Sequence, residues 1–240
     1  MFDFEELDYQ KTPHGEISLR RRAEPRLEGK IVYEVKLGDE FLMSSLFTES
    51  EVQLARLALE ELEGEELDIL VGGLGLGYTA MAALESPAVG SLTVVEVMAP
   101  VIDWHRRGLV PLGESLVADP RSHLLHADFF ALALAPGDSF FGQQPGRRVD
   151  AVLLDIDHSP SHWLNPSNSG FYTESGLQSL AGKIRPGGLF GLWSNEPSSE
   201  PFMQLLESQF ASASSHVVSF PNPYQGGESS CTVYLATVAP

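Results

Sequence analysis

The sequence has very little cysteine and few basic residues. Cys231 is its only cysteine, so no disulfide can form within the chain, and the class of small disulfide-stabilised secreted domains is excluded. Only 15 lysines and arginines stand against 33 aspartates and glutamates, which gives a formal net charge of -18. Because this charge repels nucleic-acid phosphates and anionic lipids, we expect neither nucleic acid nor a membrane surface as a partner.

Long hydrophobic runs are also missing. No segment approaches the apolar length that spans a bilayer, and the acidic start, residues 1–6, lacks the basic flank and apolar stretch of a signal peptide. We therefore expect a cytoplasmic protein in a reducing compartment. The 240 residues are enough to bury one full core, with room for a small additional unit.

From Asp68 onward, apolar strand patterns alternate with helical patterns. Near-continuous apolar strands are typical of a sheet covered on both faces, so we expect an α/β fold with a doubly wound, mostly parallel, Rossmann-like sheet. Two final strands are predicted to close it as an antiparallel pair, and the turn Arg185–Gly188 is predicted to precede the last parallel strand. The predicted strands are 69–71, 92–97, 123–126, 151–154, 189–193, 216–220 and 232–238, and the predicted helices are 79–84, 100–107, 173–184 and 200–210.

The first 47 residues have a different pattern from residues 48–240, which we assign to the main domain. Short alternating segments at 16–22, 30–37 and 40–44 predict a small antiparallel β unit. Such a unit needs a partner surface, so we expect it to form a lid or a homodimer contact. After it, Thr48 and Glu51 have the spacing of a capping box, and Gly64 is the predicted end of the helix that follows.

A glycine-rich turn follows the first strand of the main domain. In the run Leu70–Tyr78, Gly73, Gly75 and Gly77 form a G-x-G-x-G pattern that opens onto a helix. Glycines let the backbone turn sharply and let a ligand approach the main-chain N–H groups. The spacing does not fit the G-x-G-x-x-G fingerprint of dinucleotides. It is better matched to S-adenosylmethionine or its decarboxylated form.

Acidic residues follow the next two strands. Glu96 ends the second strand, 23 residues after Gly73, which is close to the spacing of an acid that binds ribose hydroxyls. Asp128 follows the third strand. It is equally suited to cap the next helix or to accept a hydrogen bond from an adenine amino group.

The densest group of reactive side chains comes after the fourth strand, at Asp155-Ile156-Asp157-His158. Ligands of doubly wound sheets lie at the carboxyl ends of the strands, so we place the reacting centre here. The segment meets no standard metal-ligand spacing, and we expect no metal.

In their order along the chain, these motifs resemble the spermidine synthases, or polyamine aminopropyltransferases, which have a methyltransferase-type Rossmann fold. Further matches lie outside the glycine loop. They are Lys36–Asp39, Thr48–Glu51, Val94–Glu96, His126–Asp128, Phe171–Glu174 and Arg185–Gly188.

The resemblance implies cofactor contacts from the glycine loop, a ribose-binding acid at Glu96, an adenine-side acid at Asp128 and a general base at Asp155. The co-substrate would be decarboxylated S-adenosylmethionine and the acceptor a small amine, contacted by Asp157 and His158.

The chain also departs from the family pattern. Leu76 stands where the family has an aspartate, and Val52–Leu54 replaces its Tyr-His-Glu stretch. Two alternatives therefore stay open. One is an S-adenosylmethionine-dependent methyltransferase of a small molecule, and the other is a dimeric relative without catalytic activity.

Overall fold

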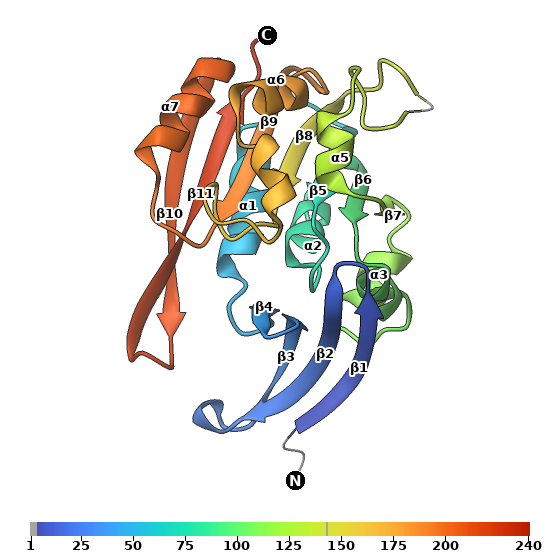
Figure 1. The fold of residues 1–240 in the computed structure, drawn as a ribbon, viewed down its shortest axis with the longest axis vertical. Coiled ribbons are helices and arrows are strands. Elements are labelled where there is room, and N and C mark those ends of the chain that lie inside the picture. The colour runs from blue at the N-terminus through green and yellow to red at the C-terminus, as the bar shows by residue number, and fades with distance from the viewer. Residues whose placement is uncertain (1–3, 143) are drawn as a thin grey trace.

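The structure is a computed structural model that describes residues 4–142 and 144–240. A seven-stranded sheet with helices on both faces stands above a four-stranded antiparallel sheet (Figure 1). The small sheet is formed by residues 4–44, which confirms the predicted N-terminal antiparallel β unit. Among the described residues, no helix is both long and apolar enough to cross a membrane.

The large sheet has the order β10-β11-β9-β8-β5-β6-β7. Strands β5 to β9 are parallel, whereas β11 is antiparallel to both of its neighbours. This confirms the doubly wound, mostly parallel sheet with a final antiparallel pair. The strands are β5 (Leu67–Gly72), β6 (Val89–Glu96), β7 (Ser122–His126), β8 (Val149–Leu154), β9 (Ile184–Ser194), β10 (Ser212–Asn222) and β11 (Gly227–Thr237).

Alternate residues of the strands face two separate cores, because successive side chains of a strand point to opposite faces. On β5, Ile69 and Val71 pack with helices α1 to α4, and Leu70 packs with α5 to α7. The helices are α1 (Glu49–Glu60), α2 (Tyr78–Leu84), α3 (Ala99–Arg106), α4 (Gly113–Ala118), α5 (Phe129–Leu134), α6 (Glu174–Ala181) and α7 (Glu200–Gln209), with short 3₁₀ turns at Pro25–Leu27 and Pro166–Gly170.

The small sheet has four strands, β1 (Phe4–Thr12), β2 (Gly15–Glu24), β3 (Lys30–Leu37) and β4 (Glu40–Ser44). The last three were predicted, together with the turn that joins β3 to β4, but β1 was not, because its residues are mostly charged or polar. Asp8 attaches β1 to the main domain by accepting a 2.6 Å hydrogen bond from Trp104 Nε1.

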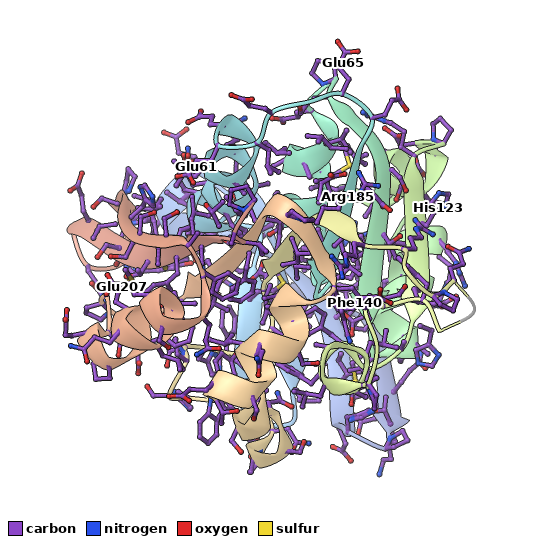
Figure 2. The ribbon with its side chains drawn as sticks, turned by 90° about the horizontal axis from the view of Figure 1, so that it is seen from above. Glu61, Glu65, His123, Phe140, Arg185 and Glu207 are labelled. Atoms are coloured by element: carbon purple, nitrogen blue, oxygen red, sulfur yellow. The ribbon has the colours of Figure 1, made fainter. Side chains whose placement is uncertain are left out.

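The predicted turn Arg185–Gly188 lies inside β9. The pairing with β8 slips here, since Val149 pairs with Ile184 and Ala151 with Leu189, so the intervening residues bulge out. Arg185 lies with Glu65 and His123 at the amino ends of the parallel strands (Figure 2). The candidate site is at the opposite end.

Candidate functional site

A cavity of about 470 Å³ lies between the carboxyl ends of the parallel strands and the N-terminal sheet. Its walls come from the glycine loop, from the residues after β6, β7 and β8, from strands β2 to β4 and from the β10–β11 hairpin. This volume fits a nucleoside-sized ligand. The position, at the switch point between β5 and β8, is where doubly wound sheets bind ligands.

The glycines of the loop are needed for close packing. Gly73 has a φ of +94°, and a Cβ there would lie 2.1 Å from the carbonyl oxygen of Asp155. A Cβ at Gly75 would lie 2.4 Å from the sulfur of Met43, which belongs to β4. Both glycines line the cavity.

Gly77, unlike Gly73 and Gly75, is not among the described residues that line the cavity. Its φ is +91°, and a Cβ would lie 2.9 Å from the ring of His105 in α3. The structure thus explains this glycine by the packing of α2 against α3, and its contact with a cofactor stays a prediction.

Glu96 holds the glycine loop in place. Its Oε2 accepts a 3.0 Å hydrogen bond from the Leu74 amide, and its Oε1 accepts one of 2.7 Å from the Met98 amide. Burial raises the pKa of this carboxyl group, whereas the backbone hydrogen bonds lower it. Glu96 also lines the cavity, so it is placed to contact a sugar bound against the loop.

Asp128 is the N-cap of α5. Its Oδ1 accepts a 3.2 Å hydrogen bond from the Ala131 amide, which confirms the capping alternative. The same residue lines the cavity next to Phe129 and Phe130. Capping therefore does not remove it from the site, and its contact with adenine stays a prediction.

Asp155 and Glu51 form a pair of carboxyl groups in the cavity wall. Asp155 Oδ2 accepts a 2.8 Å hydrogen bond from Thr79 Oγ1. Glu51, on α1, is only 6% exposed and accepts a 2.9 Å hydrogen bond from Ser50 Oγ, which in turn accepts one from Trp193 Nε1. These neutral donors orient the two carboxyl groups without neutralising them.

The environment of this pair favours a bound proton. Burial, followed by the charge of Asp155, raises the pKa of Glu51 to about 8. Burial raises the pKa of Asp155 to about 6, and the hydrogen bond from Thr79 opposes this shift. Two like charges in one desolvated site cannot both form easily, so the pair titrates as a unit and holds one proton near neutral pH.

The prediction for Glu51 was wrong. Thr48 makes no side-chain capping bond, and helix α1 ends at Glu60 rather than at Gly64. Glu51 instead lies on the buried face of the helix with Leu54, Ala55 and Ala58. Its spacing from these apolar residues, three, four and seven positions, is the sequence signal that would have placed it inward.

Glu51 should make the protein less stable as the pH rises. The folded state binds this proton more tightly than the unfolded state does, so the free energy of unfolding falls between about pH 4.5 and about pH 8. We expect Glu51→Gln to flatten this part of the curve measured by denaturant unfolding. Glu49→Gln, at an exposed position of the same helix, should leave it unchanged. A wild-type slope in Glu51→Gln would contradict the pairing.

Asp157 lies behind the cavity wall, and its predicted contact with a substrate stays a prediction. The residue is 1% exposed, and the described residues that line the cavity do not include it. Its carboxylate accepts hydrogen bonds of 2.8 Å from the Leu164 amide and 2.9 Å from both Asn168 Nδ2 and Tyr172 Oη. With its oxygens occupied in this way, Asp157 orders the loop that covers the site.

Replacing Asp157 should destabilise that loop. In Asp157→Asn, the amide group cannot accept all three hydrogen bonds, so we expect the free energy of unfolding to fall by about 2 kcal/mol. Asp128→Asn is the matched control, because asparagine caps a helix as well as aspartate does. Chemical denaturation of both variants measures the difference, and equal stabilities would rule out this role for Asp157.

His158 connects the loop after β8 to the N-terminal sheet. It lines the cavity, and its Nε2 lies 2.6 Å from Glu40 Oε1 on β4. The small sheet is therefore a wall of the site, and its role as a lid or a homodimer contact stays a prediction. Contact of His158 with a substrate stays a prediction.

The cavity wall is rich in carboxyl groups. Four carboxyl groups line it, those of Glu51, Glu96, Asp128 and Asp155. Within residues 4–142 and 144–240, no lysine or arginine lines it. Such a wall attracts a cationic ligand and disfavours one that carries a free carboxylate.

Comparison with solved structures finds a similar fold in two spermidine synthases. One, in complex with the transition state analogue AdoDATO, aligns with a TM-score of 0.74 at 15% identity, over 97% of this chain and 73% of its own. The other, from Thermotoga maritima, aligns with a TM-score of 0.71 at 15% identity, over 97% and 72%.

The chain has the fold of the spermidine synthases. This confirms the expected methyltransferase-like sheet together with its small N-terminal sheet. No family model and no curated protein sequence matches the chain.

The departure at position 76 from the spermidine synthase pattern has a packing explanation. Leu76 is fully buried in the core beside α1 to α4, and its amide lies 3.2 Å from the sulfur of Met43. A charged side chain would be desolvated there without a partner.

Proposed function

We propose that this protein transfers the aminopropyl group of decarboxylated S-adenosylmethionine to an amine. The observation that carries the proposal is that Glu96 and Asp155 line one cavity whose wall bears four carboxyl groups. Glu96 belongs to β6 and Asp155 follows β8, two strands away, which separates them by about 10 Å along the sheet. This spacing leaves room for a nucleoside with its sugar near Glu96 and its sulfur near Asp155.

Asp155 is the proposed proton acceptor. A primary alkylamine has a pKa of about 10.4, so freeing its lone pair at neutral pH costs about 4 to 5 kcal/mol. The amine nitrogen attacks the carbon next to the sulfonium, forming the N–C bond while the C–S bond breaks. The bonding electrons move to sulfur, which leaves neutral methylthioadenosine, and the amine proton moves to Asp155. Alignment of nitrogen, carbon and sulfur is then the main requirement.

The wall charges favour the decarboxylated co-substrate over S-adenosylmethionine itself. The methionine carboxylate would lie toward Glu51 and Asp155, and the described lining residues of the cavity include no lysine or arginine to pair with it. Decarboxylated S-adenosylmethionine has no such carboxylate, so the acidic wall does not repel it in this way. The structure therefore supports aminopropyl transfer better than methyl transfer.

Calorimetric titration tests this proposal. We expect methylthioadenosine and decarboxylated S-adenosylmethionine to bind, the latter at least tenfold more tightly than S-adenosylmethionine. Tighter binding of S-adenosylmethionine would favour the methyltransferase instead. If none of the three adenosyl thioethers released heat, the proposed function would be abandoned.

A further inference from the structure

The order of the strands divides the cavity into two parts on either side of Asp155. Glu96 and Asp128 follow β6 and β7, on one side of β8. On the other side lie β9, β11 and β10, which carry the part of the cavity that we call the far chamber. If the nucleoside lies over β5 to β7, the acceptor must enter from the far chamber for its amine to reach Asp155.

The far chamber has aromatic and neutral polar walls. Its lining residues are Phe47, Trp193, Asn195, Phe220, Asn222, Ser229 and Cys231. Phe220 pairs directly with Ser229 across the β10–β11 hairpin, and its ring centroid lies 5.7 Å from that of Phe47. Trp193 Nε1 donates a hydrogen bond to Ser50, the chain neighbour of Glu51. The aromatic side of the far chamber therefore starts beside the Glu51–Asp155 pair.

The β10–β11 hairpin extends toward the level of the N-terminal sheet (Figure 1), and hydrogen bonds connect its tip to β2. Tyr224 Oη donates a 2.7 Å hydrogen bond to Glu24 and accepts one of 2.9 Å from Arg22. Glu24 is thus held by Arg22 and Tyr224. The hairpin therefore forms a fixed wall of the far chamber.

Among the described lining residues of the far chamber, none is an aspartate, glutamate, lysine or arginine. Glu40 on β4 is not among the described lining residues of the cavity, and its carboxylate is hydrogen-bonded to His158. A diamine would place one ammonium at Glu51 and Asp155 and leave the second without a counter-ion in a partly desolvated site, which is costly. If the part of the acceptor beyond its amine, which we call its body, is apolar, it would instead displace water from the aromatic side chains of the far chamber.

We infer that the acceptor is a primary monoamine with an aromatic or apolar body, rather than a diamine or polyamine. The inference rests on the proposed function. The amine lies at Glu51 and Asp155, and the body lies among Phe47, Trp193 and Phe220. At the hairpin, Asn222 and Ser229 supply neutral partners for a hydroxyl group at the far end of the body.

A panel of acceptors tests the inference. The full-length protein is incubated with decarboxylated S-adenosylmethionine and, in turn, with 2-phenylethylamine, hexylamine, putrescine or spermidine, and products are measured by mass spectrometry. We expect kcat/KM to be at least tenfold higher for the two monoamines. Equal or higher values for putrescine or spermidine would overturn the inference, and so would turnover of none of the four while methylthioadenosine still binds.

If the wild-type protein does not bind methylthioadenosine, the proposed function fails. Failure of the proposed function is thereby distinguished from failure of the inference about the acceptor.

A variant sharpens the test. Phe220→Asp puts a carboxylate in the far chamber and should shift the ratio of putrescine to 2-phenylethylamine turnover at least tenfold toward putrescine. Val217→Asp, on the opposite face of β10 and 69% exposed, should not shift it. An unchanged ratio in Phe220→Asp, with methylthioadenosine binding intact, would also overturn the inference.

Discussion

Replacing Asp155 with asparagine should lower the rate of aminopropyl transfer by about 10² to 10⁴-fold, the usual contribution of a positioned general base. Asparagine keeps the shape of the side chain and its contact with Thr79, but it cannot take a proton from the amine. The affinity for methylthioadenosine should change less than threefold, because this product has no positive charge at sulfur. Steady-state kinetics and calorimetry on the same preparation measure the two effects.

The pH dependence of the reaction gives this prediction a second readout. In the wild type, kcat/KM should rise as the pH passes about 6, where the Asp155–Glu51 pair loses the first of its two protons and a carboxylate becomes free to accept one from the amine. In Asp155→Asn this limb should be lost. Asp103→Asn, at an exposed ion pair on α3, is the matched control and should behave like the wild type. Full activity in Asp155→Asn would show that the proton goes elsewhere.

Replacing Gly73 with alanine should lower the free energy of unfolding by about 3 kcal/mol. The φ of +94° disfavours any residue with a Cβ, and this atom would lie 2.1 Å from the Asp155 carbonyl oxygen, so the two neighbouring strands β5 and β8 would have to separate. The same shift would move Asp155 away from the glycine loop. We therefore expect loss of methylthioadenosine binding even where the variant is folded.

Gly29→Ala is the control for backbone strain alone. Gly29 has a φ of +81°, but nothing lies within 4 Å of its Cβ position, so the cost should be about 1 to 2 kcal/mol. Urea denaturation of both variants gives the difference. Equal losses of stability would mean that the loop and the end of β8 have room to separate, against the tight contact seen here.

The sequence predicts those parts of the fold that depend on local patterns. Apolar strands, the Gly38-Asp39 turn and the glycine loop each have a signal within a few residues, and the structure has them all. Strand β1 lacks that signal, because its charged side chains are paired within the small sheet, as Glu5 is with Arg21. The bulge at Arg185–Gly188 resembles a turn in sequence because glycine and proline serve both.

The site was harder to predict, because its chemistry depends on contacts between distant segments. Asp155 and Glu96 could be located from their positions at strand ends. Glu51 and Asp157 differ only in which way they face, into the cavity or into a loop, and tertiary packing decides this. The same sequence pattern fits a capping glutamate and a glutamate that points into the protein. Glu51 could therefore be assigned to the site only from the packing of α1 against β8 and β9.

A crystal structure of the protein with methylthioadenosine would show whether this cavity is the active site. We expect the sugar hydroxyls within hydrogen-bond distance of Glu96, the adenine beside Asp128 and the sulfur directed at Asp155, with the far chamber empty of nucleoside. A nucleoside bound outside this cavity, or bound in it with its sulfur directed away from Asp155, would contradict the proposed arrangement and the reaction derived from it.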